Sequence, residues 1–423
     1  MKFSHKGRLI ATSIFSMSAM LAITSCGTDS TAGFLFVPLA SINQQGGGGV
    51  NVFRIEHDFG KLSLLSPSPV SSGGNNAVRS VLAGAGRFLY VINQGVETSQ
   101  TSAVELFSIG GNGVLTPQQG YATQGTSPVD AAIDGSGSHL YVLDEFAPPG
   151  AQCPGNDPTK VQPPNPTAAT SCLGDITAFS IDATTGRLTL IQNQNLTNAN
   201  GTQLTYFPVG LNPIRLLIPG NAGIAFTLDQ GDSTVFPYQV NSNGQLTLTQ
   251  NGPINIGSGL FLTAIGSDGG SHIYITDAAN NQIFPFTIGP GGSLALVNPG
   301  AVPNQPGTAF PDAVLVVGKF LYIGNRGANP NNQNPNSSIS AFTVDPTTSK
   351  LQIVPNSPFA VDSGVNCLVE DPSGQYIYAS AFDDSTIRGS LLRSDGELQN
   401  LLKGTSFATG GTPSCLIASG RTS

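Results

Sequence analysis

Residues 321–330 read LYIGNRGANP, an apolar run that stops at Asn325-Arg326-Gly327 and gives way to a loop rich in Pro and Asn. The apolar run and its aromatic residue predict a buried β-strand, and the Gly and Asn predict a turn. The same aromatic-centred run recurs at a spacing of roughly 50 residues, which falls in the range of propeller repeats. Its copies are FLFV, FLYVIN, HLYVLD, IAFTLD, HIYITD, FLYIGN and YIYASA.

Three further segments complete each repeat. An alternating strand such as SISAFTVD follows the aromatic strand, then comes a turn of the type Gly-x-Leu, and a less regular strand opens the unit. Four short strands per repeat predict an all-β, seven-bladed β-propeller with four antiparallel strands per blade. The turns begin at Gly60, Gly113, Gly186, Gly244, Gly292 and Gly396, and at Ser349 in the remaining copy.

The two ends of the repeat region are complementary. The first unit, which begins at residue 34, lacks an opening strand, whereas an opening strand without a following unit stands at residues 413–417. We expect this C-terminal strand to join blade one and to close the ring without a free edge.

The composition argues against a nucleic-acid partner and against a bound metal or cofactor. Of 423 residues only 10% are charged, and the formal net charge is −8. Phosphate backbones require clustered Lys and Arg, and the chain has no such cluster, so no nucleic-acid partner is expected. The chain has no Cys-x-x-Cys pair and its four His are scattered, so neither a metal nor a cofactor is expected.

The N-terminus carries a targeting signal. A basic start, an apolar stretch and small residues before Cys26 predict an export signal. The ending Ile-Thr-Ser-Cys resembles the bacterial lipobox, in which the Cys is lipidated; the alternative is an ordinary signal peptide with a chance Cys. We expect a signal peptide at 1–25, a tether at 26–33 and a propeller at 34–423. The protein would then be a monomer in the cell envelope, held to the membrane by its lipid anchor.

The other four cysteines fall into two pairs. Cys153 and Cys172 bracket an insertion rich in Pro and Asn, and in an oxidising compartment they predict a disulfide. Cys367 and Cys415 each lie within a strand-like run. We expect these two to be buried thiols, with a bond between them as the less favoured alternative.

The long loops are predicted to share one face of the ring. They are the segments at about 146–173, 192–212, 298–310 and 327–336. Loops held by a rigid scaffold often carry binding residues, so we expect function on this face. The alternative is that loop lengths drift without a function.

Polar residues at the ends of the aromatic strands are the first candidates for a site. Asn or Asp stands there in five blades, where strand capping is the simpler explanation. Arg326 follows one of them and would either bind a ligand or pair with an acidic neighbour, Glu145, Asp144 or Asp312. The candidate ligand-binding residues are Asp144, Asp229, Gln230, Asn325, Arg215 and Asp312.

The pattern resembles the lactonase family of seven-bladed propellers, which includes 6-phosphogluconolactonases and carboxymuconate-cyclising enzymes. The similarity covers residues 34–420, through segments such as GRFLYVINQG and GKFLYIGNRG. The resemblance implies a functional Arg at Arg326, but Val129 stands at the family's His and Gln230 at its Glu. Ile214 stands at a family Arg, with Arg215 one place later. A shift of one residue turns a side chain to the opposite face of a strand, which weighs against Arg215 as a replacement.

Two functions follow from these residues. Lactone hydrolysis needs a base and a stabiliser of the oxyanion, and Glu145 and Arg326 are the candidates for these catalytic roles. The missing family residues favour instead a scaffold that binds an anionic or sugar-derived small ligand or an envelope protein. The alternative is a lactone hydrolase, a carboxylic ester hydrolase, with an altered site, and whether the protein is an enzyme stays open.

Overall fold

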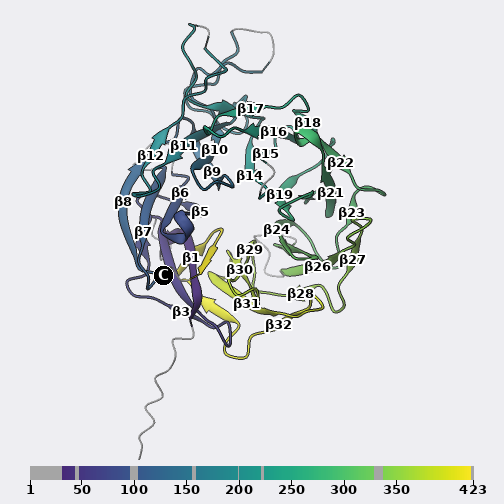
Figure 1. Ribbon diagram of the computed structural model, residues 1–423. Helices are drawn as coiled ribbons and strands as arrows, with labels where there is room; N and C mark the ends of the chain where they lie inside the picture. Colours follow the sequence, from purple (N-terminus) through teal and green to yellow (C-terminus); the bar gives the residue numbers. More distant parts are fainter. Residues whose placement is uncertain are drawn as a thin grey trace, which may run out of the picture. The chain divides into compact units, whose positions relative to one another are not determined.

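The structure is a computed structural model that describes residues 31–42, 47–95, 103–154, 159–198, 200–220, 223–327 and 337–420. Within the unit Thr31–Ser423, the strands form seven antiparallel sheets around a central axis (Figure 1). The expected seven-bladed propeller is therefore confirmed. The signal peptide at 1–25 and Cys26 lie outside the described residues. Strand β1 begins at Thr31, so residues 31–33 of the expected tether belong to the propeller.

Each blade has an inner strand beside the axis. In blade one this strand is split into β34 and β35, at the C-terminus. The inner strands are β5 (Ala77–Ala83), β9 (Thr126–Ile133), β14 (Pro213–Leu217), β19 (Leu262–Ser267), β24 (Pro311–Val317), β29 (Val365–Glu370), β34 (Gly411–Pro413) and β35 (Ile417–Gly420).

The second strand of each blade carries the aromatic repeat, and the third carries the alternating repeat. The second strands are β1 (Thr31–Ile42), β6 (Phe88–Asn93), β10 (His139–Phe146), β15 (Ile224–Asp229), β20 (His272–Asp277), β25 (Phe320–Asn325) and β30 (Tyr376–Ala381). The third strands are β2 (Gly49–Glu56), β7 (Val104–Ile109), β11 (Asp175–Ile181), β16 (Thr234–Val240), β21 (Gln282–Ile288), β26 (Ser338–Val344) and β31 (Thr386–Leu392).

The outer strand is continuous in blade two and broken in the other blades. Short 3-10 turns, η1 (Gly84–Gly86) and η2 (Pro290–Gly292), complete the described elements. The outer strands are β3 (Leu62–Leu64), β4 (Val70–Ser71), β8 (Leu115–Tyr121), β12 (Leu188–Leu190), β13 (Phe207–Pro208), β17 (Leu246–Leu248), β18 (Ile254–Asn255), β22 (Leu294–Leu296), β23 (Val302–Pro303), β27 (Leu351–Ile353), β28 (Phe359–Ala360), β32 (Leu398–Asn400) and β33 (Ser406–Ala408).

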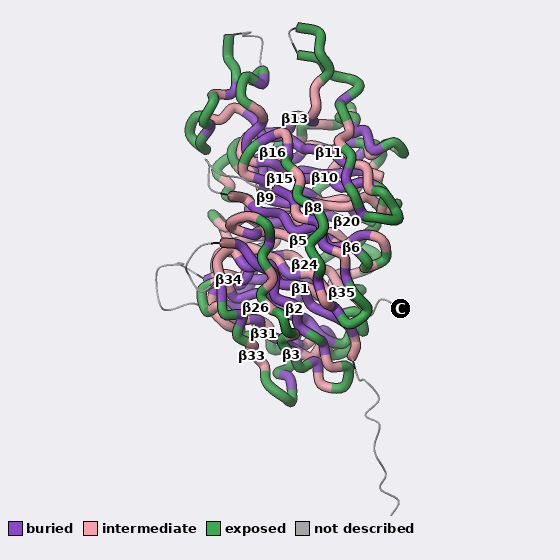
Figure 2. Tube along the Cα trace, turned by 90° about the vertical axis from the view of Figure 1, so that its left-hand side faces the viewer, coloured by how far each residue is buried: buried purple, intermediate pink, exposed green. Residues whose placement is uncertain are grey.

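In blade three a long segment breaks the outer strand between β12 and β13. Residues 191–206 separate β12 from β13, and both strands pair with β11. The segment therefore interrupts the outer strand, and the expectation that 192–212 is one uninterrupted loop is wrong. The segment 298–310 is likewise divided by β23. Exposed residues gather on the excursions at the top of Figure 2, while the second strands of the blades are buried.

The ring closes as the sequence predicts, and a disulfide reinforces the closure. β34 and β35 both pair with β1. A disulfide joins Cys367, on the inner strand of blade seven, to Cys415, between β34 and β35. The expectation that these two residues are buried thiols is wrong, because the closing strand brings them together from distant parts of the chain. The expected disulfide between Cys153 and Cys172 is confirmed.

The seams between neighbouring blades hold the core. Each of the seven seams contains one cluster of buried apolar side chains. At four seams a Tyr of the second strand donates its hydroxyl proton to the carbonyl oxygen of the Gly that opens the outer strand of the next blade. These pairs are Tyr90 with Gly186 (2.6 Å), Tyr141 with Gly244 (3.1 Å), Tyr322 with Gly396 (2.9 Å) and Tyr378 with Gly60 (2.7 Å).

The seam after blade five departs from this pattern. Ser349 stands where the other blades have Gly, and its hydroxyl forms a 2.7 Å hydrogen bond with Nε2 of His272. The buried hydroxyl of Tyr274 has no hydrogen-bond partner among the described residues. The single variation in the turn motif therefore coincides with the loss of the Tyr–Gly bond.

Candidate functional site in the axial cavity

A cavity of about 640 Å³ lies at the axis, and residues from all seven blades line it. Its wall combines the apolar side chains of the inner strands with three Arg and two Asp. A pocket in which charged groups converge on an otherwise apolar surface is the usual form of a small-molecule site. The polar lining residues are Asn76, Arg79, Ser80, Gln94, Asp130, Arg215, Asp312, Arg326, Asn366 and Ser414.

A β-bulge interrupts the inner strand of six blades near its start. In blade four it falls between Pro213 and Arg215. A bulge sets two residues against one on the neighbouring strand and re-aims their side chains. Ile214 and Arg215 consequently both line the cavity. The expectation that a shift of one residue would turn Arg215 away is wrong, because it assumed an uninterrupted strand.

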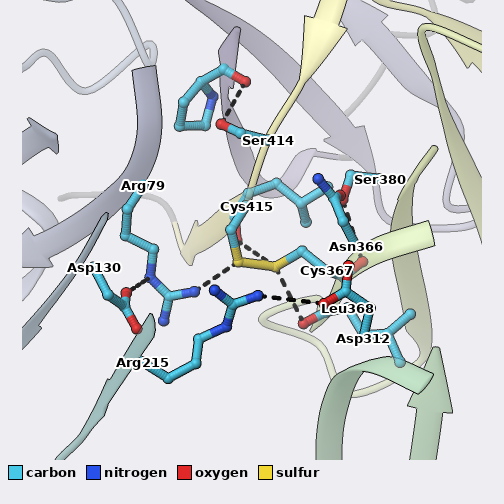
Figure 3. Close-up of a disulfide and its surroundings, with 12 residues drawn as sticks. Arg79, Asp130, Arg215, Asp312, Asn366, Cys367, Leu368, Ser380, Ser414 and Cys415 are labelled. Atoms are coloured by element: carbon cyan, nitrogen blue, oxygen red, sulfur yellow. Dashed lines mark hydrogen bonds and ion pairs between the residues drawn. A yellow bond between two sulfur atoms is a disulfide. The ribbon is translucent and has the colours of Figure 1, made fainter. Parts of the chain in front are cut away.

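Arg79 of blade two is fixed by contacts to two other blades, through Asp130 of blade three and Cys415 of blade one (Figure 3). Its Nε lies 3.0 Å from Oδ1 of Asp130, and its Nη1 donates a hydrogen bond to Sγ of Cys415 at 2.7 Å. Oδ1 of Asp130 also accepts the N–H of Ala131 at 2.9 Å, and Oδ2 accepts the N–H of Leu216 at 2.9 Å. Both oxygens of Asp130 are thus engaged in holding the wall together.

Asp312 lies at the bulge of β24, beside Arg215. Nη2 of Arg215 is 3.6 Å from Oδ1 of Asp312, and Nη1 donates to the carbonyl oxygen of Ile214 at 3.0 Å. Within the described part of the chain, the carboxylate of Asp312 accepts no hydrogen bond. Burial raises the pKa of Asp312 to about 6, against the opposing charges of Arg215 and Arg326. This carboxyl group therefore changes its charge close to neutral pH.

Arg326 follows β25 and is the cation that the sequence pattern singled out. Its guanidinium carbon lies 5.3 Å from the ring centroid of Phe382, and its Nη2 is 3.5 Å from Oδ1 of Asp383. Its Nε is buried and has no hydrogen-bond partner among the described residues. Because buried donors are nearly always paired, this N–H is a natural contact for a bound ligand.

Glu145, the candidate base, does not belong to the described lining of the cavity. Its Oε2 accepts the hydroxyl proton of Ser127 at 2.8 Å. Ser127 in turn accepts a hydrogen bond from Nε2 of Gln94 at 3.0 Å, and Gln94 does line the cavity. Glu145 thus reaches the cavity through two other side chains, and its catalytic role stays a prediction.

Asp144 lies in the interior of blade three. It is fully buried and accepts the hydroxyl protons of Thr123 at 2.8 Å and Thr177 at 3.1 Å. Burial raises the pKa of Asp144 to about 7, while these hydrogen bonds act in the opposite direction. The contacts support the strand-capping explanation for this residue.

The remaining candidates also bond to the protein itself. Asp229 and Asn325 are fully buried. Asn325 donates to the hydroxyl of Ser340 at 2.9 Å, and burial raises the pKa of Asp229 well above its usual range. Gln230 donates through Nε2 to the carbonyl oxygen of Leu262 at 2.7 Å. Of the residues expected at the site, the structure brings only Arg326, Arg215 and Asp312 to the cavity wall.

Sequence reasoning missed Arg79 and Asp130. The register of the inner strands places Arg79, Asp130 and Arg215 at equivalent positions, each directly after the bulge. A comparison of the opening strands, position by position, would have revealed charged residues at the same position in three of them. These strands are the least regular part of each repeat, so their alignment is hard to see without the pairing.

Comparisons with known proteins agree with the seven-bladed fold. Residues 219–418 match the family model described as lactonase, seven-bladed β-propeller. No curated protein sequence matches the chain. The resemblance to the lactonase family is thus confirmed over these residues, and the ring as a whole is a seven-bladed β-propeller.

Solved structures share the same architecture. A protein described as a candidate 6-phosphogluconolactonase from Bacteroides fragilis has 18% identity and a TM-score of 0.66, over 93% of this chain and 99% of that chain. A second, from Bacteroides uniformis, has 16% identity and a TM-score of 0.67, over 92% and 99%. A periplasmic gluconolactonase from Pseudomonas aeruginosa has 16% identity and a TM-score of 0.66, over 92% and 100%. At these identities the likeness establishes the fold.

Proposed function

We propose that the axial cavity binds a small anionic, sugar-derived ligand. The observation that supports this is the convergence of Arg79, Arg215 and Arg326, from blades two, four and six, on one cavity. Guanidinium groups recognise carboxylate and phosphate through paired, charge-assisted hydrogen bonds. In a chain with only 17 Lys and Arg, the placement of three in one wall favours an anion as the occupant.

The dimensions of the cavity suit a small molecule. Its volume, about 640 Å³, falls within the usual range of roughly 300–1,000 Å³ for ligand pockets. The ring encloses the arginines on all sides, so a sugar acid fits this site better than a surface of an envelope protein does.

We propose further that the protein is exported and held by a lipid on Cys26. Disulfides persist in oxidising compartments, and the propeller contains two of them. The part of the chain that the structure describes holds no helix with the length and apolarity to cross a bilayer.

Lactone hydrolysis is the second candidate function. The specific observation in its favour is Asp312, a carboxyl group of raised pKa that lies beside Arg215 and is influenced by the charge of Arg326. The names of the structural neighbours, gluconolactonase and candidate 6-phosphogluconolactonase, point the same way. A sugar acid is the product of such a reaction, so the two functions share one ligand class.

Binding is tested by calorimetry on the purified protein with gluconate, 6-phosphogluconate and, as the uncharged probe, glucose. We expect the two anions to bind, and Arg326→Gln to weaken their binding at least about tenfold, the effect of losing roughly 1.4 kcal/mol of interaction. The matched control is Arg388→Gln, because Arg388 pairs with Asp362 at 3.5 Å, as Arg326 does with Asp383, but lies outside the cavity lining. Equal losses in the two variants, or no binding of either anion, would contradict the proposal.

A further inference from the structure

We infer that Asp312 is the general base of a lactone-hydrolysing site that it forms with Arg215 and Arg326. The inference rests on the proposed anion-binding cavity and takes up its hydrolytic alternative. It differs from the expectation drawn from the sequence, in which Glu145 was the candidate base.

The contacts of the nearby carboxylates single out Asp312. Asp130 also lines the cavity, but its side chain is 3% exposed and both its oxygens accept hydrogen bonds or ion pairs from the wall. Glu145 lies outside the lining and is bonded to Ser127. Asp312 is 14% exposed, and its one ion pair, at 3.6 Å, is longer than a hydrogen bond. Its oxygens can therefore accept a proton from a water molecule in the cavity.

The electrostatic setting of Asp312 suits this role. A general base works best when its pKa lies near the operating pH, and burial raises the pKa of Asp312 to about 6. The carboxylate is then ionised at neutral pH yet basic enough to take a proton. Gln230, which stands where the resemblance predicts a Glu, cannot act as a base, so the cavity needs another residue for this function.

The two arginines supply the second requirement. Arg215 and Arg326 are the charges whose fields reach Asp312, so a carbonyl bound beside the carboxylate is also close to a cation. The buried Nε–H of Arg326 has no hydrogen-bond partner among the described residues. A preorganised donor of this kind stabilises negative charge as it develops on the carbonyl oxygen.

The reaction follows from these positions. Asp312 takes a proton from water as the water oxygen forms a bond to the carbonyl carbon of the lactone. The carbonyl electron pair moves onto its oxygen, which faces the guanidinium groups. When the tetrahedral intermediate collapses, the bond between the acyl carbon and the ring oxygen breaks. The proton on Asp312 passes to the ring oxygen, which leaves a hydroxy acid and restores the carboxylate.

The test measures the hydrolysis of glucono-1,5-lactone, corrected for the spontaneous rate, together with the binding of gluconate. We expect Asp312→Asn to lower kcat at least about 100-fold, the lower end of what a general base contributes. The variant should bind gluconate as well as the unaltered protein, because it removes a negative charge beside two arginines. The matched control is Asp362→Asn, which removes an arginine-paired carboxylate outside the cavity lining and should leave turnover unchanged.

The pH dependence of the unaltered protein gives a second measurement that does not depend on a variant. We expect kcat/KM to fall as the pH drops below about 6, because Asp312 must be ionised to accept a proton. A flat profile across this range would overturn the inference even if Asp312→Asn fails to fold.

The outcomes separate the inference from the proposed function. Turnover that survives in Asp312→Asn, or that is lost in Glu145→Gln but kept in Asp312→Asn, overturns the role of Asp312 and leaves the binding function standing. Gluconate binding without hydrolysis of the lactone does the same. If the unaltered protein binds neither gluconate nor 6-phosphogluconate, the proposed function itself is refuted.

Discussion

The seams between the blades and the wall of the axial cavity are built from the same strands, but they use the repeat differently. At the seams, residues of one repeat contact the matching residues of the next, as in the four bonds from Tyr to Gly. At the axis, equivalent positions carry different residues, so that Arg79, Asp130 and Arg215 occupy one column of the inner strands. A contact that repeats from seam to seam stabilises the ring. Different residues at equivalent positions of the inner strands produce an asymmetric site at its axis.

The bulges explain how one architecture serves both purposes. Beyond the bulge each inner strand pairs regularly with its neighbour, and its apolar side chains join the seams. At the bulge, the strand directs an additional side chain to the cavity. Asp312 and Asn366 stand at such positions, so a side chain there can vary without disturbing the regular pairing.

The largest expected effect concerns the disulfide that belongs to both regions. Cys367 and Cys415 lie in the cavity wall and join blade seven to blade one. Replacing both with Ser should lower the free energy of unfolding by about 2–4 kcal/mol, because the ring loses a covalent closure. Cys153→Ser with Cys172→Ser is the matched control, since that bond closes one excursion of blade three. Denaturant titration measures the free energy of unfolding of both double variants. An equal loss in the two would show that the bond that closes the ring stabilises the protein no more than the bond within one excursion.

The second prediction concerns the pH dependence that the cavity wall imposes on stability. The pKa of Asp312 is raised from 3.8 to about 6 on folding, so the folded state holds this proton more tightly. The stabilisation that this proton gives the folded state is complete below about pH 4 and is lost as the pH rises through about 6. At about 1.4 kcal/mol per unit of pKa, the loss amounts to as much as about 3 kcal/mol. Asp144 and Asp229, whose pKa values burial also raises, make the stability of both proteins fall over this range. Unfolding titrations from pH 4 to about pH 7 should therefore show a larger fall in the unaltered protein than in Asp312→Asn; parallel curves would disprove the prediction.

The smallest effects are expected at the seams. Tyr378→Phe leaves the carbonyl oxygen of Gly60 without its hydrogen bond, which should cost about 1 kcal/mol. Tyr274→Phe removes a buried hydroxyl that has no hydrogen-bond partner among the described residues, so its cost should be close to zero. Thermal unfolding of the two variants compares the seams directly. If Tyr274→Phe proves the more costly change, the proposed role of the Tyr–Gly bonds is incorrect.

The site could be predicted only in part from the sequence. Arg326 and Asp312 were recognised because they stand next to the aromatic strand end and at the start of an opening strand. Glu145, Asp144 and Asn325 met the same sequence criterion, yet their side chains bond to Ser127, Thr177 and Ser340 in place of facing the cavity. Position along a strand places a residue at one end of the ring, but the local hydrogen bonds decide which way its side chain turns.

By itself the sequence determined the class of fold, the number of blades and the closure by the C-terminal strand, because each of these follows from a periodic pattern that is visible locally. It also determined the bond between Cys153 and Cys172, which are close in the chain. The tertiary structure alone decided the bond between Cys367 and Cys415, the approach of Arg215 to Asp312 and the bonding of both Asp130 oxygens within the cavity wall. These depend on bulges and on contacts between different blades, and such geometry has no signature in the order of residues along one strand.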